Sequence, residues 1–236
     1  EYRGNGGVGG KYGSTLTGSM LRGGFGGGVG GGGVGGGGSV RRGKNSPFGF
    51  DHVYDTRATQ EEVYRGATEG LVRSVLEGFN ASVFAYGATG SGKTYTMMGN
   101  ERTPGVMGLA MQELWEAIEE TRGEYSYEVK VSCLEVYNEK LYDLFVADSP
   151  YLEMREDDAG NVCVPRLSVE HPRTVEEVQS MLALANSRRK QSPTDANAES
   201  SRSHAVFQVT VLRTPRTVGL TAPTSIGKLS LIDLAG

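Results

Sequence analysis

Apolar and polar positions recur with two different periods along this chain, and from residue 45 onward they predict helices and strands in turn. A Thr-x-x-Glu capping box predicts a helix from Thr59 to about Glu77, and apolar residues at helical spacing predict others over 107–118 and from Thr174 to about Asn186. Alternation predicts strands at 127–133, 205–212 and 228–233, a short apolar run predicts a buried strand at 81–86, and 162–169 is expected to be extended. This order is typical of an α/β domain with helices on both faces of a central sheet.

Glycine content divides the chain into two parts. Of the 36 glycines, 21 lie in residues 1–44, a segment that cannot bury enough apolar surface to offset its ordering entropy. We therefore expect residues 1–44 to be low-complexity and disordered, and residues 45–236 to form one domain. The first part carries a net charge of +5 and the second −9. Because the basic residues of 1–44 are sparse and lack interleaved aromatics, we expect a solvated tail or linker and no nucleic-acid binding.

Several classes of protein are disfavoured by what the sequence lacks. No stretch approaches the roughly 20 apolar residues of a membrane span, and the glycine-rich start is no signal peptide, so we expect no membrane partner. Cys133 and Cys163 are too few for a disulfide framework, and Cys133 reads as a core side chain. The three histidines are dispersed, so no histidine metal site is expected. The low cysteine content favours a reduced, intracellular setting.

The most specific motif lies between the strand predicted at 81–86 and a helix expected to begin near Tyr95. Residues 87–94 complete a G-x-x-x-x-G-K-[ST] phosphate-binding loop, which would arise by chance in roughly one chain in a hundred of this length. Lys93 is expected to reach the β- and γ-phosphates, and the Thr94 hydroxyl to bind Mg²⁺. The backbone amides that would surround the phosphates belong to Gly87, Ala88, Thr89, Gly90, Ser91 and Gly92. Nucleotide binding is therefore the expected function.

Two further stretches indicate a nucleotide hydrolase. Asp233 ends an apolar strand, where a carboxylate holds Mg²⁺ in phosphate-loop enzymes, usually through water. Residues 197–204 place an asparagine and three serines around Arg202, which offers hydroxyls for Mg²⁺ and γ-phosphate and a cation for transition-state charge. Neither stretch is specific by itself. Each indicates nucleotide hydrolysis because it occurs together with the phosphate loop.

Together these motifs resemble the kinesin motor domain. Residues 84–97 look like its phosphate loop, residues 197–204 match its N-x-x-S-S-R-S-H first switch, and residues 231–236 match the start of its D-L-A-G-S-E second switch. Residues 50–55 and 134–139 carry further signatures, and the resemblance runs from about Arg41 to Gly236. Segments 86–90, 104–107 and 193–197 look most like the kinesin-eight class.

The resemblance implies a P-loop NTPase fold, a three-layer sandwich whose mostly parallel or mixed sheet is flanked by helices. It implies an ATPase that moves on microtubules of the cytoplasmic cytoskeleton, with ATP and Mg²⁺ as cofactors, and a homodimer through a coiled coil. Thr94 and Ser201 would lie near Mg²⁺, and Asp233 would act on the cation through water. Tyr95 would stack on adenine and Asn197 would line the nucleotide site. The residues expected to take part in catalysis or to sense the γ-phosphate are Lys93, Ser200, Ser201, Arg202 and Gly236.

The chain departs from the family pattern at both ends. The glycine-rich segment stands where the family has an R-x-R-P strand, and the sequence stops at Gly236, before the glutamate expected to bridge Arg202. Residues 45–236 are therefore expected to be a partial motor domain, truncated at the second switch, that retains ATP·Mg²⁺ binding without microtubule-stimulated hydrolysis. Two alternatives stay open: a non-catalytic, nucleotide-gated microtubule-binding module and, more weakly, a GTP-directed switch protein, although no N-K-x-D signature is visible.

Overall fold

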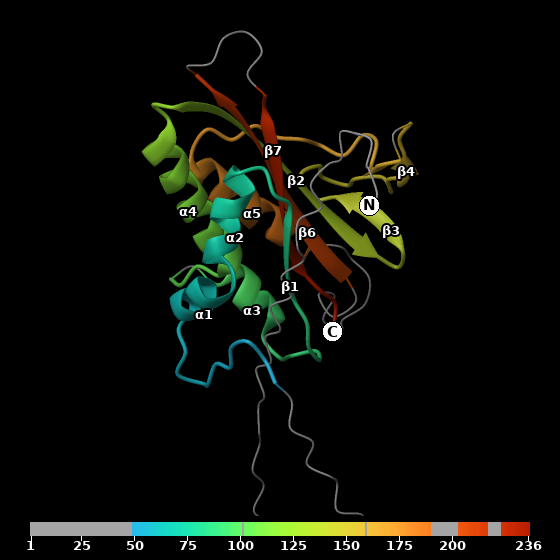
Figure 1. Cartoon of the computed structure of the whole chain (residues 1–236). Coiled ribbons are helices and arrows are strands. Elements are labelled where there is room, and N and C mark those ends of the chain that lie inside the picture. The colour runs from blue at the N-terminus through green and yellow to red at the C-terminus, as the bar shows by residue number, and fades with distance from the viewer. Residues whose placement is uncertain (1–48, 101, 159, 190–202, 217–222) are drawn as a thin grey trace, which may run out of the picture.

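A five-stranded mixed sheet forms the centre of the molecule (Figure 1). The computed structural model describes residues 49–100, 102–158, 160–189, 203–216 and 223–236, so the disorder expected for 1–44 falls outside the described residues. Its strands follow the order β1-β7-β6-β2-β3; β1 and β7 pair in parallel, and the other pairs are antiparallel. The bounds are β1 Ala81–Ala85, β2 Tyr125–Tyr137, β3 Lys140–Asp143, β6 Ser203–Pro215 and β7 Ser225–Asp233.

The antiparallel part of the sheet follows from local sequence signals. β2 and β6 pair from Tyr125↔Pro215 to Tyr137↔Ser203, so both strands are longer than the alternation alone predicted. Asn138 and Glu139 take positive φ angles of 49° and 63°, which makes the β2–β3 connection the tight turn that suits the twist of a hairpin. Beyond it, β4 (Arg155–Glu156) and β5 (Val162–Cys163) form a separate two-stranded sheet. The extended segment expected over 162–169 is a strand only at its start, because a turn follows in which Arg166 has a φ of 67°.

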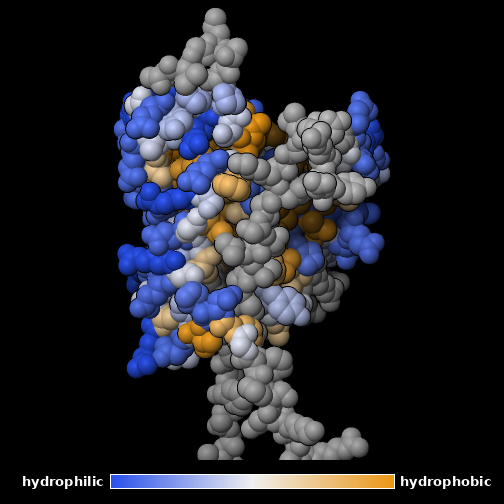
Figure 2. Space-filling model, in the orientation of Figure 1, coloured by the Kyte–Doolittle hydropathy of each residue, from blue (hydrophilic) through white to orange (hydrophobic). Residues whose placement is uncertain are grey.

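Helices flank the sheet, which confirms the predicted α/β class and the P-loop NTPase-type fold with a mixed sheet. They are α1 Gln60–Ala67, α2 Glu69–Leu76, α3 Lys93–Met98, α4 Val106–Thr121 and α5 Val175–Arg189. In the part of the chain that the structure describes, these helices gather on one face of the sheet, whereas the sequence led us to expect helices on both faces (Figure 1). Hydrophilic side chains cover the outside of this helix layer (Figure 2). None of the described helices combines the length and apolar character that crossing a membrane requires.

The helix predicted from Thr59 to Glu77 is in fact two helices. Its capping box is confirmed, since the Thr59 hydroxyl accepts from the Glu62 amide while the Glu62 carboxylate accepts from the Thr59 amide. The break falls at Thr68, whose φ of −131° ends α1 before α2 begins. Gly66 and Gly70 lie on either side of the break and have low helix propensity. Because the segment around Thr68 has low helix propensity, breaking the helix there costs little helix stability.

The strand that precedes the phosphate loop is less buried than predicted. Of its residues, Ala85 is buried, whereas Ser82 and Phe84 are exposed on the side away from the helices. Ala81, Val83 and Ala85 pack against the core on the helix side, so one face of β1 is covered by the helices and the other is open among the described residues. An apolar run of six residues does not reveal this difference, because it predicts burial on both faces.

The hydrophobic core lies between the helix layer and the sheet. The stripe predicted on α4 faces it, with Met107, Ala110, Met111 and Leu114 buried and Trp115 and Ile118 at its border. Alternate residues of β2, β6 and β7 meet this stripe, and Phe207 of β6 is the largest side chain that is fully buried. Cys133 points into the same core, as its place in an alternating strand predicted.

α2 approaches β7 so closely that only glycine fits at position 227. A Cβ added to Gly227 would lie 2.0 Å from the Val75 carbonyl oxygen and 2.9 Å from that of Phe79. Because both neighbours are backbone atoms, they cannot turn aside as a flexible side chain would. This contact holds α2 against the strand that ends at Asp233.

We predict that Gly227→Ala lowers the free energy of unfolding by about 1–3 kcal/mol, because the added methyl overpacks this contact. Gly70→Ala in α2 is the matched control: nothing lies within 4 Å of its added Cβ. Removing a helical glycine should stabilise the protein by about 0.5–1 kcal/mol. Urea denaturation of both variants measures the difference, and equal midpoints would contradict the packing argument.

The two cysteines should differ in reactivity. Burial raises the pKa of the Cys133 thiol to about 12, whereas Cys163 is exposed. Since the thiolate is the reactive form, we predict that Ellman's reagent at pH 8 modifies one thiol in the native protein and both after denaturation. Cys163→Ser should abolish the fast reaction. Rapid modification of that variant would show that Cys133 is accessible.

Candidate nucleotide site

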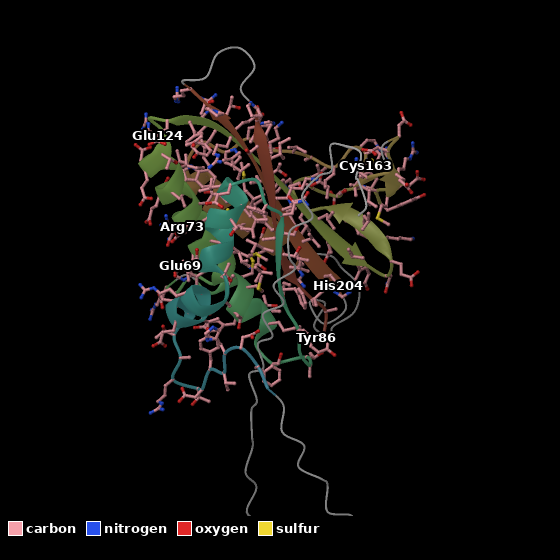
Figure 3. The ribbon with its side chains drawn as sticks, in the orientation of Figure 1. Glu69, Arg73, Tyr86, Glu124, Cys163 and His204 are labelled. Carbon is pink, nitrogen blue, oxygen red and sulfur yellow. The ribbon has the colours of Figure 1, made fainter. Side chains whose placement is uncertain are left out.

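The parallel pairing of β1 and β7 builds the site. Ala85 and Asp233 are register partners, so the loop that leaves β1 and the end of β7 lie at the same edge of the sheet. Figure 1 shows this edge, where the turn from β1 into α3 lies near the C-terminus. Tyr86 and His204 both lie toward it in Figure 3, although they are far apart in the sequence. Crevices at the carboxyl ends of parallel strands are where α/β proteins bind their ligands.

The predicted phosphate loop connects β1 to α3. Gly90 and Gly92 have φ angles of 78° and 94°, a region that side chains disfavour, and the Ser91 amide donates to the Ala88 carbonyl over 3.1 Å. α3 begins at Lys93, two residues earlier than expected, because Gly92 serves as its cap and accepts from the Thr96 amide. The loop is thus a tight turn of backbone, as the glycine spacing predicted.

Lys93 reaches back across this loop. Its ammonium donates to the Gly87 carbonyl over 2.9 Å and to the Ala88 carbonyl over 3.2 Å. Gly236 lies against the same group: a Cβ added there would be 2.5 Å from Lys93 Nζ and 2.6 Å from the Thr89 amide nitrogen. The structure therefore brings together the loop, its lysine and the glycine predicted to sense γ-phosphate.

Thr94 and Asp233 meet below the loop. The Thr94 hydroxyl donates to Asp233 Oδ2 over 2.7 Å, and Asp233 is fully buried. Its other oxygen, Oδ1, has no hydrogen-bond partner among the described residues. A hydroxyl beside a buried carboxylate with an open oxygen suits a hard cation such as Mg²⁺. Within the described ranges no three His, Cys, Asp or Glu side chains form a metal-holding group.

A cavity of about 490 Å³ continues from the loop toward the segment before α1. Tyr95 contributes to its wall, and Gln60 fixes that residue by donating from Nε2 to the Tyr95 carbonyl over 2.6 Å. The volume falls within the usual range for small-molecule sites. Residues 50–63 form the opposite wall, with Phe50, His52, Val53 and Tyr54 among them.

Asp55, one of the residues that line this cavity, forms an ion pair with Arg57. Arg57 donates to the Asp55 carboxylate from Nη2 over 2.7 Å, and its backbone amide donates to the same side chain. These hydrogen bonds hold the pKa of Asp55 below its ordinary value. Asp55 is therefore ionised at neutral pH, and Arg57 offsets its charge at the mouth of the cavity.

Of the first switch motif, only the last two residues lie in the part of the chain that the structure describes. Asn197, Ser200, Ser201 and Arg202 lie outside the described residues and stay predictions. The motif's last two residues begin β6, where Ser203 is fully buried and His204 Nδ1 accepts from the Ala235 amide over 3.0 Å. The end of the first switch motif therefore contacts the start of the second.

Two residues of the site escaped sequence reasoning. Gln60 is buried behind Tyr95, although it reads as an ordinary polar residue in the first turn of a helix. Arg189 is buried against Asp233, although a basic residue in the last turn of a helix usually faces solvent. No spacing or motif distinguishes either residue, because both act through contacts with distant segments.

Comparison with known proteins agrees with this geometry. Residues 38–236 match the family described as Kinesin motor domain. The chain is 53% identical over 195 residues to Kinesin-like protein KIF18B of Gallus gallus, covering 83% of this chain and 24% of that protein. It is 45% identical over 198 residues to Kinesin-like protein KIP3 of Saccharomyces cerevisiae, covering 83% of this chain and 25% of that protein.

A solved structure, reported as "Structure of a fast kinesin: Implications for ATPase mechanism and interactions with microtubules", matches with a TM-score of 0.75 and 33% identity. The match covers 80% of this chain and 54% of the chain in the solved structure. The chain thus spans about a quarter of the length of the two curated relatives described above. Both relatives are kinesin-8 members, which confirms the class that the sequence indicated. The chain belongs to the kinesin motor domain family.

Proposed function

We propose that this chain binds ATP with Mg²⁺ and forms part of a motor that hydrolyses ATP to move on microtubules of the cytoskeleton. The observation that carries the proposal is the Thr94–Asp233 hydrogen bond under a loop spanned by Lys93. It joins the two motifs that phosphate-loop enzymes use for phosphate and for the cation. The subject of the matching structure, which includes interactions with microtubules, supports the microtubule part.

Each described residue of the site has a role that its geometry supports. The Lys93 ammonium would exchange its two carbonyl partners for phosphate oxygens, which attract it more strongly because they are charged. Thr94 would keep donating to Asp233 while its oxygen faces the cation, which when bound would neutralise charge on the phosphates. Tyr95 would stack on adenine within the cavity that Gln60 helps to shape.

The two switches would respond to the γ-phosphate together. Gly236 already lies against Lys93 and the Thr89 amide, so a phosphate bound there would contact its backbone. The His204–Ala235 hydrogen bond ties the end of the first switch to the second. Ser200, Ser201 and Arg202 are proposed to complete this response from the first switch, Ser201 near Mg²⁺ and Asn197 beside the nucleotide. A homodimer through a coiled coil stays an implication of the resemblance.

Lys93→Ala should weaken ATP·Mg²⁺ binding by about tenfold or more, since it removes charge-assisted hydrogen bonds to phosphate. Lys228→Ala is the control, because Lys228 is exposed on β7 five residues before Asp233. Calorimetric titration of both variants measures the affinities. Unchanged affinity in Lys93→Ala would refute the loop's role, and preference for GTP over ATP would favour a GTP-directed switch protein.

The motor proposal is tested by phosphate release with and without microtubules, in this chain continued through the rest of the family's motor domain. We expect hydrolysis to rise when microtubules are added and Lys93→Ala to abolish that rise. Nucleotide-dependent microtubule binding with no turnover would instead favour the non-catalytic module. Hydrolysis that is indifferent to microtubules would contradict the proposed partner.

A further inference from the structure

A buried cluster of charges lies directly behind the phosphate loop. Arg189 at the end of α5 is 3% exposed, Glu135 of β2 is 4% exposed and Asp233 of β7 is fully buried. The cluster therefore holds one positive and two negative groups in the interior. Isolated charges are costly in such a place, so their arrangement has to be held by specific hydrogen bonds.

The Arg189 guanidinium connects two strand ends. Its Nη1 donates to Asp233 Oδ2 over 2.5 Å, while its Nη2 donates to the Ser203 carbonyl over 2.8 Å. Its Nε donates to the Ser203 hydroxyl over 3.2 Å and lies 4.0 Å from Glu135 Oε1. A planar group with several fixed donors can make these contacts at once, which a lysine ammonium cannot.

The same carboxylate oxygen serves both Arg189 and the phosphate loop. Asp233 Oδ2 accepts from Arg189 Nη1 and from the Thr94 hydroxyl, whereas Oδ1 has no partner among the residues that the structure describes. Rotating the carboxylate would break one of the two hydrogen bonds in a buried site. Arg189 therefore determines which oxygen faces Thr94 and which stays open.

We propose that Arg189 is a positioning residue of the nucleotide site. It holds Asp233 so that Oδ2 orients the Thr94 hydroxyl and Oδ1 stays available to water on the cation, and it ties this arrangement to the end of the first switch at Ser203. The inference rests on the proposed function of Thr94 and Asp233. Without the guanidinium, Asp233 Oδ2 would lose the donor that holds it beside the Thr94 hydroxyl, and the carboxylate would turn away from Thr94.

The test needs variants that separate positioning from folding. Arg189→Met combined with Glu135→Gln removes one positive and one negative side chain together, so it leaves the net charge of the cluster unchanged. Arg189→Lys keeps the positive charge but loses the fork of donors. Arg188→Met is the matched control, because Arg188 donates from Nη1 to the Leu144 carbonyl over 3.1 Å, whereas the donors on Asp233 and Ser203 belong to Arg189.

The measurement is the affinity for a fluorescent ATP analogue in EDTA and then with added Mg²⁺, together with the thermal midpoint. In the wild-type chain Mg²⁺ should strengthen binding. In the double variant and in Arg189→Lys this gain should shrink by about tenfold, the loss expected for one charge-assisted hydrogen bond, while affinity in EDTA stays the same. Arg188→Met should keep the wild-type gain.

The outcomes separate this inference from the proposed function. If Mg²⁺ gives no gain in the wild-type chain, the proposed Thr94–Asp233 site fails whatever Arg189 does. If the wild-type chain gains and a folded Arg189 variant gains equally, the positioning role is overturned. Loss of folding in both Arg189 variants, with Arg188→Met folded, would assign Arg189 to the fold and also overturn it.

Discussion

The parallel pairing of β1 with β7 is the constraint on which the nucleotide site depends. These strands are about 140 residues apart in sequence, and their register sets Ala85 beside Asp233. Every site contact between the phosphate loop and the second switch follows from that alignment, including Thr94 with Asp233 and Gly236 with Lys93. A slip of one residue would turn Asp233 to the opposite face, because side chains alternate along a strand.

Packing on the helix side keeps this register. α2 lies on β7 at Gly227, and the core residues of α4 fill the space between helices and sheet. The long β2–β6 ladder continues the sheet on the other side of β7 and carries the end of the first switch motif at Ser203. The site is thus built on strand ends, whose positions are better defined than those of free loops.

The interior behind the site is charged, and buried charges of this kind do not by themselves stabilise a fold. Replacing a buried ion pair by apolar residues is often neutral or favourable for stability, so a cluster of Arg189, Asp233 and Glu135 is weak evidence for a purely structural role. Its position, one hydrogen bond from Thr94, suggests what the arrangement supplies. In the proposed role, it fixes the direction of a carboxylate that the Thr94 hydroxyl and an arriving cation would share.

The sequence by itself determined the features whose signals are local. The capping box at Thr59, the apolar stripe of α4, the alternating strands and the loop at 87–94 each follow from spacing within a few residues, and the structure contains all of them. Only the tertiary structure decided the break at Thr68, the open face of β1 and the roles of Gln60 and Arg189. The physical reason is that these features depend on which distant segment packs against the residue. Burial of a glutamine or an arginine is set by partners that no local pattern specifies.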